Sequence, residues 1–146
     1  MSFEVVDSLG HGRLLRGSCG DAPRKGLEDF ARDAKIALPA SGERRWTSFP
    51  GCFAQGGLDA GTALLLGTLG NLQVAPGRVL DFACGTGVIA ADVLARWPES
   101  LVFGCDHDAV AVAAARRNVP RGKFVVGDGL GCVDGGNFDL VVSNPP

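Results

Sequence analysis

From residue 58 onward, apolar residues follow two spacings in turn, and these predict alternating helices and strands. Helical spacing predicts helices over 58–72, 88–97 and 108–118. Short apolar runs predict strands over 78–83, 101–105, 123–126 and 138–143. This alternation is typical of parallel βαβ units with helices on both faces of one sheet. We therefore predict an α/β fold with a Rossmann-like, doubly wound, mostly parallel sheet.

The first part of the chain follows a less regular pattern. Residues 3–6 and 13–15 predict the two strands of a hairpin around a turn at residues 10–12, with His11 exposed to solvent. Leu27, Phe30, Ala31, Ala34 and Leu38 recur at helical spacing. They predict a helix that Pro39 ends.

The boundary of the α/β unit is expected near Trp46. Residues 39–45 predict a polar link, and residues 46–53 predict a short strand broken by Pro50 and Gly51. We interpret residues 1–45 as the tail of an upstream domain or a linker. Residues 46–146 then form the α/β domain. Because the chain stops directly after the fourth parallel strand, we expect this domain to be C-terminally incomplete.

Composition excludes few classes of protein, but it does argue against a strongly basic nucleic-acid binder. Hydrophobic residues make up 46% of the chain and charged residues 21%, as in ordinary globular proteins. The net charge is −2, and residues 47–146 carry six Lys or Arg against nine Asp or Glu. If RNA binds, we expect most of the basic surface outside this chain.

The cysteines and the apolar runs indicate a reducing, cytoplasmic setting. The five cysteines are widely spaced and form no CxxC pair, which argues against a disulfide framework and against a metal site. Cys84 and Cys105 lie in apolar runs and are expected to be buried thiols. No leader pattern opens the sequence, and no apolar run is long enough to span a membrane.

A Gly-rich segment follows the first parallel strand, at residues 81–87. Gly85, Gly87 and Ala90 satisfy the G-x-G-x-x-G/A form of the dinucleotide fingerprint. Glycines allow a sharp turn and close approach of the backbone to a ligand, and the following helix N-terminus favours negative groups. Such a segment can also be an ordinary turn. We predict a cofactor site here that includes Asp81, Ala83, Gly85 and Gly87.

Asp106 ends the second parallel strand, 19 residues after Gly87. A carboxylate at this position can accept hydrogen bonds from both hydroxyls of a ribose. The alternative role is a helix cap, which Asp108 already offers. His107 could flank an adenosine, although a surface role is the alternative.

Polar residues also follow the third and fourth parallel strands. Asp128, with Gly129 after it, is placed to meet an adenine amino group or to form a polar turn. Residues 143–146 read Ser-Asn-Pro-Pro, and two prolines would stiffen a loop that carries Asn144. The Asn144 side-chain oxygen and the next backbone carbonyl could accept both hydrogens of a planar amino group. That arrangement would orient the nitrogen lone pair for attack on a methyl sulfonium.

These four motifs, in this order, resemble class I S-adenosylmethionine-dependent methyltransferases of the amino-methylating, Asn-Pro-Pro-aromatic type. Residues 49–66 are similar to the segment before the Gly-rich motif in the ribosomal small-subunit guanine-N2 methyltransferase C family. The resemblance covers residues 46–146. It implies S-adenosylmethionine as cofactor and methyl transfer to an exocyclic amino nitrogen. The implied target is guanine N2 of small-subunit ribosomal RNA, with that RNA or the small ribosomal subunit as partner.

The resemblance also implies roles for particular residues. In that family the segment before the Gly-rich motif closes over the methionine end of the cofactor, which implies cofactor roles for Phe53, Asp59, Gly61 and Thr62. The implied catalytic residues are Asn144, Pro145 and Pro146. Two departures are visible: Ala83 stands where the family often has Gly, a change we expect to be tolerated, and Ala54 where Ser is frequent.

Three alternatives remain open from the sequence. A nicotinamide- or flavin-dependent oxidoreductase would use the same Gly-rich fingerprint, but it leaves residues 144–146 and 53–62 unexplained. A related enzyme could methylate an adenine amino group in nucleic acid or a glutamine amide in a protein. A non-catalytic RNA-binding or assembly module could also retain the fold.

Overall fold

The computed structural model describes residues 2–10, 12–18, 20, 23–133 and 136–145. The strands are β1 (Ser2–Leu9), β2 (Gly12–Ser18), β3 (Arg32–Leu38), β4 (Gly42–Ser48), β5 (Arg78–Phe82), β6 (Leu101–Asp106), β7 (Lys123–Val126) and β8 (Leu140–Ser143). The α-helices are α1 (Ala60–Leu69), α2 (Val88–Arg96) and α3 (Ala109–Asn118). Short 3-10 helices are η1 (Leu27–Phe30), η2 (Phe53–Gly56) and η3 (Leu130–Cys132).

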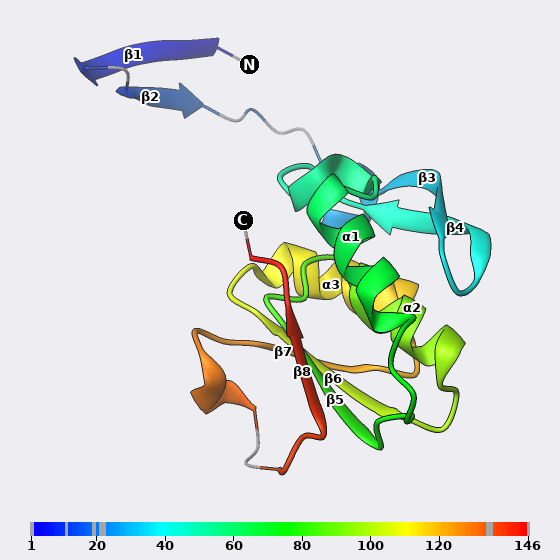
Figure 1. Ribbon diagram of the computed structural model, residues 1–146. Helices are drawn as coiled ribbons and strands as arrows, with labels where there is room; N and C mark the ends of the chain where they lie inside the picture. Colours follow the sequence, from blue (N-terminus) through cyan, green and yellow to red (C-terminus); the bar gives the residue numbers. More distant parts are fainter. Residues whose placement is uncertain (1, 11, 19, 21–22, 134–135, 146) are drawn as a thin grey trace.

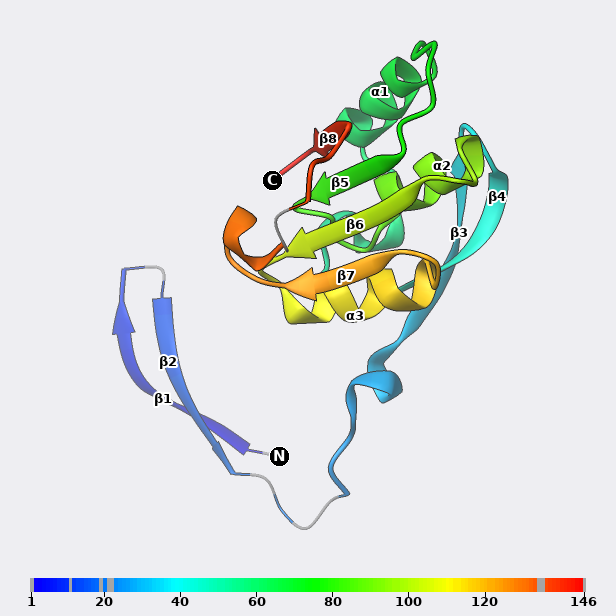
Figure 2. The same cartoon turned by 90° about the horizontal axis from the view of Figure 1, so that it is seen from below.

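The centre of the molecule is a four-stranded parallel sheet in the order β7-β6-β5-β8. Val79 of β5 lies opposite Val102 of β6 on one side and Leu140 of β8 on the other. The predicted Rossmann-like α/β class and the four parallel strands are therefore confirmed, with β8 beginning two residues later than expected. The carboxyl ends of all four strands meet at one edge of the sheet (Figure 2).

The three α-helices lie on one face of this sheet (Figure 1). The prediction of helices on both faces is wrong for the described part of the chain, and the handedness of the crossovers explains why. Right-handed connections from β5 to β6 and from β6 to β7 move in the same direction, so α2 and α3 fall on the same face. The connection from β7 to β8 moves in the other direction and carries only η3 among its described residues.

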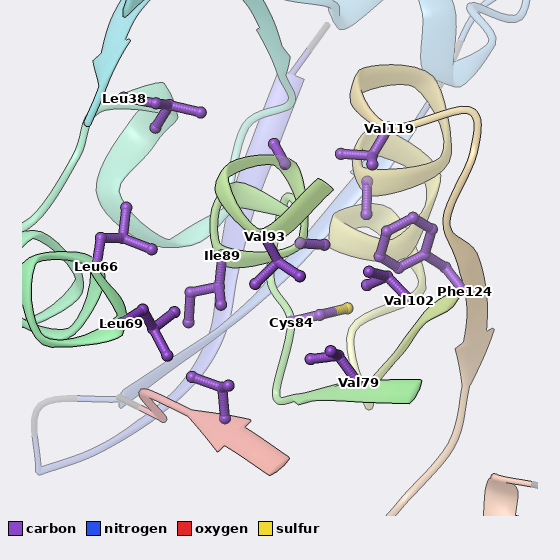
Figure 3. Close-up of a cluster of buried hydrophobic side chains, with 14 of the residues drawn as sticks. Leu38, Leu66, Leu69, Val79, Cys84, Ile89, Val93, Val102, Val119 and Phe124 are labelled. Carbon is purple, nitrogen blue, oxygen red and sulfur yellow. The ribbon is translucent and has the colours of Figure 1, made fainter. Parts of the chain in front are cut away.

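The hydrophobic core fills the space between the sheet and these helices (Figure 3). Val79 and Val102 of the sheet pack against Ile89 and Val93 of α2, and Leu66 of α1 closes one side. Leu66 is fully buried, so Leu66→Ala is expected to cost about 2–5 kcal/mol of folding free energy. This core holds the carboxyl ends of the strands in fixed relative positions.

The helix predicted from Leu27 to Leu38 is wrong. Only η1 is helical there, and β3 pairs antiparallel with β4 from Arg32 opposite Ser48 to Leu38 opposite Gly42. The predicted polar link at 39–45 accordingly contains a turn and the first half of β4. Long-range pairing and the burial of Ile36 and Leu38 in the main core outweigh the local helical spacing.

The predicted N-terminal hairpin is confirmed as β1 and β2, and it stands apart from the parallel sheet (Figures 1 and 2). His11, in its predicted turn, lies outside the described residues. The α-helices of the described chain are at most ten residues long, too short to cross a bilayer.

Candidate functional site

The Gly-rich segment forms a tight turn between β5 and α2. Ala83, Gly85 and Gly87 have φ angles of 58°, 52° and 88°. A Cβ atom on Gly87 would lie 3.2 Å from Val119 Cγ2 and 3.3 Å from the Ala115 backbone, so this glycine serves both the turn and close packing against α3. Ala83 adopts a left-handed conformation that disfavours a side chain, so alanine carries a conformational cost here that glycine would not.

Asp81 is fully buried beneath this turn. Its Oδ2 accepts a hydrogen bond of 3.0 Å from the Ala90 backbone N–H, in the first turn of α2. Its Oδ1 is buried and has no partner among the described residues. Burial raises the pKa of Asp81 to about 7, and the nearby Asp106 charge adds to this effect against the opposing Ala90 bond. Asp81 therefore secures the start of α2.

Asp106 joins the Gly-rich turn to the start of α3. Its Oδ2 accepts from Gly85 N–H at 2.8 Å, and its Oδ1 accepts from Asp108 N–H at 2.9 Å. Asp108 caps α3 through Val110 N–H, as predicted. His107 is mostly exposed, with Nδ1 3.4 Å from Asp106 Oδ1. Each Asp106 oxygen can accept a further hydrogen bond, because a carboxylate oxygen has two acceptor positions.

Two adjoining cavities open at this edge of the sheet. The larger, of about 280 Å³, is lined by Gly51, Phe53, Ala83, Gly85, Asp106, His107, Asp108, Ala111 and Asn144. The smaller, of about 50 Å³, is lined by Phe53, Ala54, Gly57, Asp59, Thr62, Ala83, Cys84, Gly85, Thr86, Val88, Ile89 and Asn144. Phe53, Ala83, Gly85 and Asn144 line both, so the two cavities form one continuous candidate site.

A larger hollow of about 540 Å³ lies along β3 and β4. Its lining includes two ion pairs, Lys35 with Glu43 and Arg45 with Asp33. No residue of the Gly-rich turn lines it, and four of its five charged side chains are taken up in these two ion pairs, with Arg44 as the fifth. We therefore place the candidate site in the two smaller cavities.

Asn144 lies just beyond β8, where its side chain contacts the start of α1. Its Nδ2 donates to Asp59 Oδ1 at 3.2 Å and to Thr62 Oγ1 at 2.9 Å. A Cβ atom on Gly61 would lie 3.1 Å from Asn144 Oδ1 and 3.2 Å from Nδ2. The structure thus brings Asn144 to Asp59, Gly61 and Thr62, which lie more than 80 residues earlier in the chain.

Other predicted site residues lie away from the cavities. Asp128 is exposed and Gly129 half-buried after β7, and neither lines either cavity. Pro145 is exposed beside Asn144, and Pro146 lies outside the described residues. Within the described ranges, no group of three or more His, Cys, Asp and Glu side chains could hold a metal ion.

The cavity-lining Cys84 is a buried thiol, as predicted, and so is Cys105 behind it. Burial raises the pKa of Cys84 strongly and that of Cys105 to about 11. Both side chains therefore stay protonated at neutral pH and are poor nucleophiles.

The Gly-rich turn also has a buried support that the sequence did not reveal. Trp46 of β4 is fully buried, and its Nε1 donates to Thr86 Oγ1 at 3.0 Å. Asn118, at the end of α3, donates to the carbonyls of Thr47 and Thr86 and accepts from Thr47 N–H. A tryptophan and an asparagine without a motif gave no signal for this role.

Comparison with known proteins adds the following findings. Residues 43–146 match the family model described as methyltransferase small domain. Ribosomal RNA small subunit methyltransferase C from Pseudomonas putida is 43% identical over 97% of this chain, and that from Pseudomonas entomophila is 42% identical. This chain spans 43% of the length of each. A TehB-like SAM-dependent methyltransferase from Corynebacterium glutamicum overlaps 59% of this chain and 45% of its own, with 28% identity and a TM-score of 0.47.

Proposed function

This chain belongs to the methyltransferase small domain family, and from that premise we propose that the protein transfers a methyl group from S-adenosylmethionine to an exocyclic amino nitrogen. The observation that carries this proposal is the placement of Asn144. Its amide NH₂ is held by Asp59 and Thr62, while the residue lines both cavities of the candidate site. The amide oxygen is thereby left to accept a hydrogen bond from a substrate amine.

The cavities contain the donors and acceptors that S-adenosylmethionine requires. In this assignment the adenosine end occupies the larger cavity, where Asp106 has acceptor positions left for ribose hydroxyls and Asp108 and His107 are near. The methionine end would then lie toward the smaller cavity, above the Gly-rich turn. Asp81 lines neither cavity, so the cofactor role proposed for it is indirect, through its support of the Gly-rich turn and the start of α2.

Seven residues keep the cofactor roles predicted from the sequence, either by contact or by shaping the turn. They are Phe53, Asp59, Gly61, Thr62, Ala83, Gly85 and Gly87. His107 is also retained as a residue beside the adenosine. Asp128 and Gly129 are retained as candidates for the adenine edge, because they follow β7 at the same end of the sheet. When bound, S-adenosylmethionine would supply an electrophilic methyl group, and these residues would hold that methyl group in position.

The catalytic contribution of this chain is orientation of the acceptor. Asn144 Oδ1, with the adjoining backbone carbonyl, would accept the two hydrogens of the amine and point its lone pair toward the methyl group. Pro145 would stiffen that loop, and the role of Pro146 stays a prediction from the sequence. The bound cofactor would supply the methyl group and retain the electron pair of its carbon–sulfur bond, and the amine held by Asn144 would lose one proton to solvent.

We further propose guanine N2 of small-subunit ribosomal RNA as the acceptor. The similarity of residues 49–66 to the guanine-N2 methyltransferase C family supports this choice, as do the names of the relatives that this chain matches. The acidic balance of residues 47–146 implies that RNA phosphates are bound mainly by other surfaces. With a role in ribosomal RNA processing, we propose a cytoplasmic location.

The test is methyl transfer by the full-length protein from labelled S-adenosylmethionine to small-subunit RNA or particles that lack the modification. Nucleoside analysis of the product should give N2-methylguanosine. A methylated adenosine would keep the chemistry and overturn the guanine assignment. Tight binding of NAD together with no binding of S-adenosylmethionine would instead support an oxidoreductase.

A further inference from the structure

We propose that Asp59 and Thr62 are positioning residues that fix the orientation of the Asn144 amide, so that its oxygen faces the site. The inference rests on the proposed function, because it concerns the residue that would hold the methyl acceptor. It assigns these two side chains a role toward Asn144, separate from any contact with a cofactor.

Three hydrogen bonds connect the side chains of this cluster. Thr62 Oγ1 donates to Asp59 Oδ2 at 2.6 Å, and Asn144 Nδ2 donates both to Asp59 Oδ1 and to Thr62 Oγ1. Asp59 is also the N-cap of α1, where its Oδ1 accepts from Thr62 N–H at 3.0 Å. The start of the helix therefore fixes Asp59 and Thr62 independently of Asn144. Asn144 lies 85 residues after Asp59 and 82 residues after Thr62.

The chemistry of these groups permits only one orientation of the amide. Hydrogen bonding from Thr62 lowers the pKa of Asp59, so at neutral pH its carboxylate only accepts. The Thr62 hydroxyl donates its single proton to Asp59, so toward Asn144 it can only accept a hydrogen bond. If the Asn144 amide rotated by half a turn, its oxygen would face two acceptors, which is repulsive. The NH₂ group must therefore face α1.

Gly61 allows the close approach that this contact requires. A Cβ atom at residue 61 would lie between 3.1 and 3.2 Å from both terminal atoms of Asn144 and from Asp59 Oδ1. Such contacts are tighter than ordinary van der Waals packing, so any larger residue would displace Asn144. The small residue and the two polar partners thus define one position and one orientation for the catalytic amide.

The test uses a matched set of threonine variants in the full-length protein, assayed at saturating S-adenosylmethionine. Thr62→Val keeps the shape and the backbone bond to Asp59 but removes the hydroxyl, and Thr62→Ser restores it. Thr68→Val is the control, because Thr68 lies on the same helix and its hydroxyl only donates to Leu64 O. We expect Thr62→Val to lower turnover by about fivefold to tenfold, the effect of one lost hydrogen bond. Thr62→Ser should recover most of that loss.

Combination with Asn144→Ala separates positioning from a general structural effect. If Thr62 acts through Asn144, adding Thr62→Val to Asn144→Ala should cause no further loss of turnover. A further loss equal to that of Thr62→Val alone would overturn the proposal. Unchanged turnover in Thr62→Val would overturn it as well.

A second measurement does not depend on methyl transfer. In protein labelled with ¹⁵N at asparagine side chains, the Asn144 NH₂ signal is identified by its disappearance in Asn144→Ala. We expect that signal to shift in Thr62→Val and to follow the acid titration of Asp59 in the wild type. A signal insensitive to both changes contradicts the proposal. If the signal responds but the wild type transfers no methyl group, the proposed function fails and the positioning contact stands.

Discussion

At the scale of single residues, Ala83 shows how a motif position differs from its sequence reading. From the sequence, alanine in place of glycine is a change between two small residues, but in the structure Ala83 has a φ of 58°. The left-handed conformation costs a non-glycine residue about 1–2 kcal/mol. Asp106 and Asp81 offset such strain by bonding to Gly85 N–H and to Ala90 N–H on either side of the turn.

Asp81 makes the stability of the fold depend on pH. The pKa of Asp81 is about 7 in the folded protein, and an aspartate in an unfolded chain titrates near about 3.9. Between these values the folded state binds more protons than the unfolded state, so the free energy of unfolding falls as pH rises from about 4 to about 7. Below this window both states are protonated, and above it both are ionised.

We therefore expect Asp81→Asn to remove the decline of stability between about pH 4 and about pH 7, since asparagine mimics the protonated acid. Urea unfolding of the cofactor-free, full-length protein across this range measures it. Asp59 provides a contrast, because its lowered pKa confines its effect on the free energy of unfolding to lower pH. An identical slope in wild type and Asp81→Asn would show that Asp81 is not the responsible group.

At the scale of elements, the parallel strands could be predicted, but the β3–β4 hairpin could not. Strands β5 to β8 are short apolar runs followed by Gly, Asp or Pro, and both signals are local. In β3, Ala34 and Leu38 fit a helical spacing equally well, and only pairing with β4 decides the outcome. The bond from Trp46 to Thr86 spans 40 residues and likewise leaves no local pattern.

Some features of the candidate site could likewise be predicted from local sequence patterns, and others could not. The positions of Gly85, Asp106 and Asn144 at the carboxyl edge of the sheet follow from the strand pattern. The contact of Asn144 with Asp59 and Thr62 depends on where α1 packs, which no spacing in the sequence encodes. The methyltransferase resemblance is confirmed at the level of the family by the match to residues 43–146. The cofactor roles that it implies for residues 53–62 stay predictions, and periodicity alone does not suggest them.

Asn118 is the element-scale link between the β3–β4 hairpin and the Gly-rich turn. Asn118→Ala would leave the Thr47 N–H and the carbonyls of Thr47 and Thr86 without their partner in a buried site. We expect it to lower the free energy of unfolding by about 3 kcal/mol, the cost of unpaired buried groups. Urea unfolding gives the total, and amide exchange at Thr47 gives the local effect. The same substitution at exposed Asn137 should change stability by less than about 0.5 kcal/mol; equal effects at both positions would refute the role of Asn118.

At the scale of the whole molecule, several apolar residues of the described chain remain exposed. Val141 of β8 and Val125 of β7 lie on the sheet face away from the three helices, and Val5 and Leu14 lie on the separate β1–β2 hairpin. Both faces of a parallel sheet are normally covered, and an isolated hairpin is marginally stable. When the polypeptide of residues 1–146 is expressed by itself, these exposed surfaces would associate with other protein molecules.

We accordingly expect residues 1–146, expressed alone, to bind the dye ANS and to melt over a broad range. Amide exchange should be rapid in β1 and β2 and slowest in β5 and β6. The full-length protein is the control and should bind little dye. A sharp, cooperative melt of a monomeric 146-residue polypeptide would contradict this account of its exposed surfaces.

In the proposed function, one end of the site binds the cofactor while Asn144 holds the acceptor, and two substitutions separate these roles. Asp106→Ala should weaken S-adenosylmethionine binding by about 1.5–3 kcal/mol, because hydrogen bonds to a charged group are lost. Its turnover at saturating cofactor should fall less. Asn144→Ala should barely change cofactor affinity but lower turnover about 100-fold, since the bond to the amine strengthens in the transition state.

The most direct measurement is therefore the turnover of full-length Asn144→Ala at saturating S-adenosylmethionine, with cofactor affinity measured on the same sample by calorimetry. We expect a loss of about two orders of magnitude in methyl transfer to small-subunit RNA with cofactor affinity retained. Near-normal turnover in this variant would contradict it.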